Sequence, residues 1–147
     1  MSIRAAVRYH AMEDADIAEI VDERIYTSIV PQTVEPPYLL IQHIFGVPDQ
    51  CMAGESGMEH AGVQFDAFAT TEDEAADLID KVRLAFDGLS TTIGDTDEDA
   101  TIRVSRALMR TRRSFGPTPY RGDEFGLFRV MADFEFIYDI TVATPNA

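Results

Sequence analysis

The chain has 147 residues, of which 46% are hydrophobic and 10% aromatic, a composition typical of one globular domain and not of a disordered chain. Its formal net charge of −14 argues against non-specific binding to duplex DNA, because such binding needs several Lys or Arg side chains at each site. The charge is uneven: residues 1–102 hold 5 basic and 21 acidic side chains, whereas residues 103–147 hold 7 basic and 5 acidic ones.

The single cysteine, Cys51, excludes an internal disulfide and is typical of a reducing compartment. The first residues lack the apolar segment of a signal peptide. No apolar run approaches the ~20 residues that cross a bilayer. We therefore expect a protein that is made and assembled in the cytoplasm, without a membrane partner.

The N-terminal segment, from Ser2 to about Val21, is predicted to form one or two helices. Asp14 is a suitable N-cap for the second of them. Arg24-Ile25-Tyr26 follows as a short strand-like unit. The loop from Ser28 to Pro37 then holds three prolines that prevent helix formation, namely Pro31, Pro36 and Pro37.

Two strong strands are predicted next, Tyr38–Val47 and Ala61–Thr70, joined by a loop from Asp49 to Gly62. A helix is predicted from Thr71 to about Leu89. Its start has the pattern of a capping box, in which Thr71 and Glu74 satisfy free backbone amides. Apolar residues then recur at helical spacing: Ala75, Leu78, Ile79, Val82, Phe86 and Leu89.

The last third is predicted to hold a polar loop over Thr91–Ala100, a strand over Ile102–Phe115 and a loop over Gly116–Gly126. From Leu127 to Val142 every even-numbered residue is apolar, which predicts a long strand with one buried face. The fold class is therefore α+β over a single domain, residues 1–147. We expect an antiparallel sheet of about four strands, with the long amphipathic helix on one face and an N-terminal helix nearby.

The sequence shows no recognisable motif for a catalytic, metal or cofactor site. His43, Cys51 and His60 are not spaced as zinc ligands usually are. The acidic run Asp95–Asp99 resembles the start of a calcium loop, but Ala100 and Arg106 stand where the loop needs Gly and Glu. No phosphate-binding glycine loop or nucleophile elbow is present. We expect no enzyme activity, no metal and no cofactor.

One charged cluster has a possible functional role, an Arg-rich stretch made of Arg103, Arg106, Arg110, Arg112 and Arg113. These cations either pair with the acidic remainder, within or between subunits, or line an assembly interface or a ring lumen. Strand alternation predicts Arg106, Arg110 and Arg112 on one face and the other two on the opposite face. No single-faced stripe for DNA is expected.

The order of several short motifs resembles the tail-completion proteins of long-tailed bacteriophages and gene transfer agents, which include tail terminators and tail-to-head joining proteins. The motifs are Arg24-Ile25-Tyr26, Pro31-Gln32, Pro37-Tyr38, Gly54–Gly57, Phe68-Ala69-Thr70 and Glu74-Ala75. The segment Ile93–Gly126 departs from the family pattern.

The resemblance implies a structural virion protein that forms a hexameric ring on the head-proximal end of the tail tube. Such a ring stops tube polymerisation and joins the tail to the head. Its implied partners are further copies of itself, the major tail tube protein and a head–tail connector or adaptor. DNA passes through the ring without sequence-specific binding.

Two alternatives stay open at this point. The first is a head-completion or neck protein of the same particle. The second, of another class, is a small α+β enzyme or ligand-binding protein with a pocket between helix and sheet. A nucleic-acid-binding regulator is disfavoured by the net charge of −14.

Overall fold

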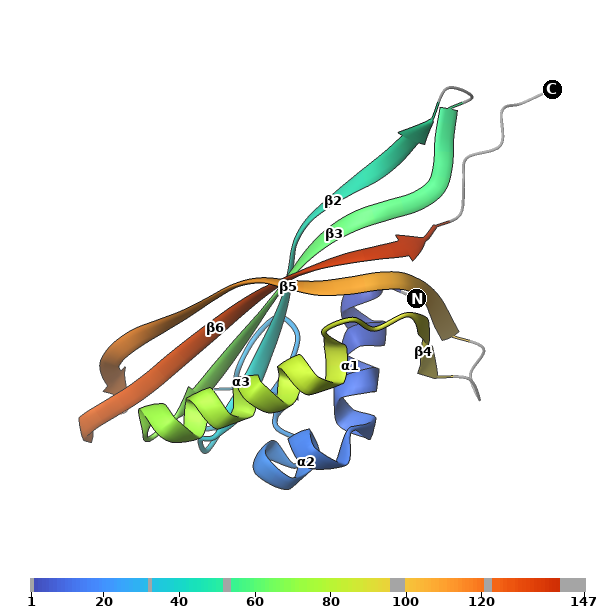
Figure 1. Cartoon of the computed structure of the whole chain (residues 1–147). Helices are drawn as coiled ribbons and strands as arrows, with labels where there is room; N and C mark the ends of the chain where they lie inside the picture. The colour runs from blue at the N-terminus through green and yellow to red at the C-terminus, as the bar shows by residue number, and fades with distance from the viewer. Residues whose placement is uncertain (1, 32, 52–53, 96–99, 121–122, 141–147) are drawn as a thin grey trace.

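The computed structural model describes residues 2–31, 33–51, 54–95, 100–120 and 123–140. These residues form three helices and six strands (Figure 1). The helices are α1 (Ile3–Glu13), α2 (Ala15–Val21) and α3 (Glu72–Phe86). The strands are β1 (Ile25–Tyr26), β2 (Tyr38–Cys51), β3 (Gly54–Ala69), β4 (Thr91–Asp95), β5 (Ala100–Tyr120) and β6 (Asp123–Asp139).

All six strands belong to one sheet with the order β1-β2-β3-β6-β5-β4. Strand β1 is parallel to β2, and every other neighbouring pair is antiparallel. The three helices lie on the same side of the sheet (Figure 1). We call that side the helix face and the opposite side the open face.

The alternation predicted for the last strand is confirmed and decides which residues form the core. In β6, Val130, Ala132, Phe134 and Phe136 are buried on the helix face, and Asp133 and Glu135 lie between them on the open face. Phe86 of α3 packs 5.1 Å from Phe65 of β3, measured between ring centroids. The buried stripe of α3 is Ala75, Leu78, Ile79, Val82 and Phe86, as the helical spacing predicted.

The predicted helix starts are confirmed by their caps. Asp14 Oδ1 accepts hydrogen bonds from the backbone amides of Asp16 and Ile17, both at 3.0 Å. Thr71 Oγ1 accepts one from the amide of Glu74 at 3.2 Å. Each bond satisfies an amide that has no partner within its own helix.

The predicted α+β class is confirmed, but the sheet has six strands instead of about four. The short strand-like unit after Arg24 joins it as β1, parallel to β2, and β4 lies where a loop was predicted. The N-terminal segment forms two helices, and the predicted loops over Asp49–Gly62, Thr91–Ala100 and Gly116–Gly126 are largely strand. Residues 96–99, which hold most of the acidic run, lie outside the described residues.

Most of the strand residues that were predicted as loop belong to the ends of two long hairpins, β2–β3 and β5–β6. Figure 1 shows the β2–β3 ends and the β5–β6 ends extending past the helices in opposite directions. Strands beyond the helix layer have no buried face, so they need no apolar alternation and tolerate Gly and Pro. Pro48 is accommodated there because β2 is an edge strand over this stretch.

Candidate assembly surface

The Arg24-Ile25-Tyr26 motif joins the helix layer to the sheet. The Arg24 side chain donates from Nε to the carbonyl of Pro37 at 2.8 Å and from a terminal nitrogen to the carbonyl of Ile20 at 3.4 Å. The backbone carbonyl of Arg24 also accepts a bond from Leu39 at 3.0 Å. Arg24 therefore fixes the end of α2 against the start of β2.

A row of rings and one cation crosses the open face from β1 to β5. Tyr26 packs edge-on against Tyr38, and Tyr38 stacks on Phe68 with ring centroids 4.8 Å apart. Arg129 lies over Phe68 at 5.9 Å and over Phe115 at 4.7 Å. The last four are cross-strand neighbours, so these contacts fix the register of β2, β3, β6 and β5.

The proline loop covers part of this row. Val34 is buried and forms a small apolar cluster with Tyr38 and Leu127. The Val34 amide bonds to the carbonyl of Pro31 at 3.2 Å, which closes a turn. Of the family-motif residues, Gln32 lies outside the described residues. The remaining ones have structural roles in the loop and the row.

The row is supported by a buried ion pair. Asp66 is 1% exposed and accepts from Arg129 at 2.9 Å through Oδ1. Its other oxygen accepts from Gln64 Nε2 at 2.9 Å. A carboxylate this deeply buried needs such partners, so we assign Asp66 to the architecture of the sheet.

The structure corrects the predicted facing of the Arg-rich stretch. Two β-bulges, at Ser105 and Arg110, each add one residue to β5 and reverse the alternation. As a result Arg103, Arg106, Arg110 and Arg113 lie toward the open face, and Arg112 alone lies on the helix face. The bulges have no distinct signal in the sequence.

Three of these five cations are already used within the chain. Arg110 bonds to Glu135 at 2.8 Å, Arg112 bonds to Asp80 of α3 at 2.5 Å, and Arg113 lies 5.5 Å from the ring centre of Phe115. Arg103 and Arg106 are exposed, and among the described residues they make no hydrogen bond, ion pair or ring contact. These two are therefore available to a partner.

Glu135 connects two strands by accepting from two partners. Its carboxylate accepts from Arg110, and its other oxygen lies 3.2 Å from His60 Nδ1. The hydrogen bond with His60, together with that from Arg110, lowers the pKa of Glu135 below its ordinary value. On the helix face, burial and the neighbouring Glu59 carboxylate, to which the hydroxyl donates, raise the pKa of Tyr138.

An apolar patch on β2, which the sequence did not reveal, lies near the free cations. It consists of Ile44, Phe45 and Val47, each more than half exposed. Val47 lies in a cross-strand row with His60, Ile137 and Arg106. Exposed apolar side chains beside Arg are typical of a protein interface.

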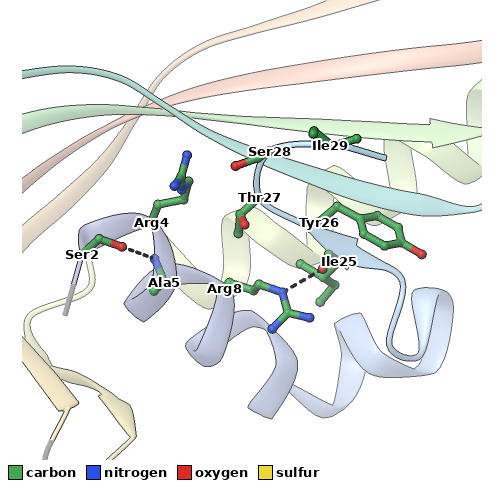
Figure 2. A pocket seen from close by; sticks show the side chains of 9 residues that line it. All are labelled: Ser2, Arg4, Ala5, Arg8, Ile25, Tyr26, Thr27, Ser28 and Ile29. Atoms are coloured by element: carbon green, nitrogen blue, oxygen red, sulfur yellow. Dashed lines mark hydrogen bonds between the residues drawn. The ribbon is translucent and has the colours of Figure 1, made fainter. Parts of the chain in front are cut away.

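A groove separates α1 from the segment that follows β1. It has a volume of about 500 Å³ and is lined by Ser2, Arg4, Ala5, Arg8, Ile25, Tyr26, Thr27, Ser28 and Ile29. Figure 2 shows Arg4 and Arg8 leaving α1 on the side that faces Ile25–Ile29. Ile29 is 83% exposed at the end of the groove.

Within the part of the chain that the structure describes, no group of three or more His, Cys, Asp and Glu residues is arranged to hold a metal ion. The Nε2 atom of His43 lies 2.9 Å from the carbonyl of Phe45. The side chain of Cys51 lies outside the described residues. No helix in the described ranges is long and apolar enough to span a bilayer.

Comparison with known families decides what kind of surface this is. Residues 5–139 match the family described as "Tail completion protein gp17". The chain belongs to this tail completion family. The resemblance of the short motifs to tail-completion proteins is thus confirmed over most of the chain.

This tail completion protein also shares its fold with a chain from a structure described as "Virion of native gene transfer agent (GTA) particle". The TM-score is 0.73 at 13% sequence identity, over 94% of this chain and 95% of the other. No curated protein matches the sequence significantly.

Membership of the tail completion family makes the chain a structural component of a virion, located at its tail or neck. The family is one of structural tail proteins, which favours an assembly surface over an active site.

Proposed function

We propose that this tail completion protein forms a ring of six copies that caps the head-proximal end of the tail tube. The ring ends tube polymerisation and offers the surface to which the head joins. Its partners are other copies of the chain, the major tail tube protein and a head–tail connector or adaptor. DNA passes through it without sequence-specific contacts.

The observation that carries the proposal is the separation of charge between two parts of the molecule. The stretch from Glu13 to Glu23, on the helix side, holds six carboxylates and no cation. Arg103 and Arg106 are exposed on the open face, beside the apolar patch. Two unlike surfaces on one chain are what a head-to-tail ring requires, because each copy presents both to its neighbours.

In this arrangement the two free cations contact the acidic stretch of the adjacent copy. Arg110, Arg112 and Arg113 contribute indirectly, since their in-chain contacts hold β5 in place. The hairpins that extend past the helices provide rigid edges for contacts above and below the ring.

Electron microscopy of lysates from a strain with this gene deleted tests the proposal. Overlong tail tubes without heads, beside filled heads without tails, are expected. Tails of normal length that fail to join heads would contradict termination and indicate a head-joining or neck role. Intact tailed particles would overturn a role in tail completion.

A further inference from the structure

The groove beside α1 contains two cations, Arg4 and Arg8, whose charges do not favour the helix. Arg4 lies in the first turn of α1, where the helix dipole disfavours a positive charge. Both α2 and α3 instead carry acidic residues in their first turns. Arg8 stands four residues further on, and like charges at this spacing cost a helix about 0.2–0.5 kcal/mol.

Within the part of the chain that the structure describes, Arg4 has no compensating contact. It is half-buried, and among the described residues its guanidinium makes no hydrogen bond or ion pair. Four other cations among the described residues, Arg83, Arg110, Arg112 and Arg129, each pair with a carboxylate, whereas Arg4 does not. An unpaired cation held in a groove is a feature that a negatively charged partner would satisfy.

Arg8 is held in position for the same partner. Its Nε donates to the carbonyl of Ile25 at 2.8 Å, which fixes the side chain and leaves its terminal N–H groups unused by any described residue (Figure 2). A fixed guanidinium loses little entropy when a carboxylate binds. The hydroxyls of Ser2, Thr27 and Ser28 add neutral hydrogen-bonding groups around the two cations.

We propose that this groove binds a short, extended acidic segment of another protein. The carboxylates of the segment pair with Arg4 and Arg8, and an apolar side chain packs beside Ile29 or Tyr26. The groove volume of about 500 Å³ lies in the range of small-ligand sites. A helix, which is about 10–12 Å wide, is too thick for such a groove, so the bound segment is expected to be extended.

The proposed partner is a protein other than a second copy of this chain. The acidic clusters that the structure describes, Glu13–Glu23 and Glu72–Asp80, lie on helices and their caps, so they are not extended segments. The inference therefore goes beyond ring formation. It concerns a groove whose lining residues lie between Ser2 and Ile29, far in the sequence from Arg103 and Arg106.

The test is an NMR titration of the full-length, ¹⁵N-labelled chain with a blocked octapeptide that alternates Asp or Glu with Val. A matched peptide carries Asn and Gln in place of the acids. The acidic peptide is expected to shift the amide signals of Thr27, Ser28 and Ile29 and to bind at least about tenfold tighter than its neutral counterpart. Raising the salt concentration is expected to weaken the binding of the acidic peptide.

Arg4→Glu is expected to weaken binding of the acidic peptide about tenfold without lowering the melting temperature, since Arg4 makes no hydrogen bond or ion pair within the described residues and a carboxylate suits the first turn of a helix. Arg83→Glu, an exposed substitution on α3, is the matched control and leaves binding unchanged.

Three outcomes would overturn the proposal: no binding of the acidic peptide, shifts centred on β5 instead of the groove, or equal affinity for both peptides. Self-association that depends on Arg4, seen by analytical ultracentrifugation, would also overturn it, because the occupant would then be a second copy. None of these outcomes bears on tube termination, which the gene deletion tests separately.

Discussion

The ring of Phe45 lies directly over Gly62, its cross-strand partner on the open face. A Cβ placed on Gly62 would come within 2.3 Å of Cε1 of that ring. Because Gly62 has no side chain, the Phe45 ring can lie over β3. This contact fixes one member of the apolar patch.

Gly62→Ala tests that contact through the free energy of unfolding. In the wild-type chain it is expected to lower stability by about 1 kcal/mol, because the ring must move. In a Phe45→Ala background the same change is expected to raise stability by about 0.5 kcal/mol, since Gly carries the larger entropy cost in a strand. Urea unfolding of the four proteins measures the coupling. Equal effects in both backgrounds would show that no contact exists.

Asp66→Ala is expected to lower stability by about 2–3 kcal/mol, because it leaves the Arg129 guanidinium without its buried partner. This is less than the roughly 3–5 kcal/mol that breaking a fully buried pair costs, since the Arg129 side chain is 32% exposed. Asp80→Ala is the control: its pair with Arg112 is exposed and is worth at most about 1 kcal/mol. Chemical denaturation compares the two variants. A similar loss in both would mean that burial of Asp66 has no energetic consequence.

Glu135→Gln tests the effect of the lowered pKa on stability. A carboxyl group whose folded-state pKa is lowered stabilises the protein above its unfolded-state value, ordinarily 4.5, and loses that contribution as the pH falls through the folded-state value. The advantage of wild type over Glu135→Gln is thus expected to be constant above about pH 5.5 and to shrink below pH 4.5. Unfolding measured from pH 3 to pH 7 gives the curve. A difference that grows toward low pH would contradict the assignment.

The double variant Arg103→Glu, Arg106→Glu tests the ring contact. It is expected to reduce tailed particles about tenfold, because losing charge pairs in an interface costs a few kcal/mol. Purified protein is expected to unfold as wild type does, since neither side chain has a partner within the described chain. Arg83→Glu serves as the control for added negative charge. Normal particle yields from the double variant would reject these residues as interface contacts.

Much of the fold follows from unbroken sequence patterns. Helix α3 and strand β6 are predictable because their apolar residues keep one period over their whole buried length. The hairpin ends escaped prediction because strands outside the helix layer have no face to bury. Strand β1 is only two residues long, and its pairing with β2 depends on the Arg24 contact more than on any alternation.

The candidate surface was less predictable than the fold. The Arg-rich stretch was recognisable from its composition. The face of the sheet on which each arginine lies depends on two β-bulges, which composition does not reveal. The division of the stretch into engaged and free cations depended on partners distant in sequence, such as Asp80 and Glu135. Arg4 was overlooked because it forms no cluster along the chain; only the fold brings it across from Ile29.

The bulges in β5 also determine where this strand tolerates a change of length. Ser105 and Arg110 are the two residues of the Arg-rich part of β5 that have no partner on β6, so each is an extra residue in the ladder. Deleting Ser105 would leave every flanking pair in register and remove only a local bend. Deleting Arg110 would leave the pairs equally intact but would remove the anchor of Glu135. Two positions that are equally dispensable to the backbone thus differ in what their side chains contribute.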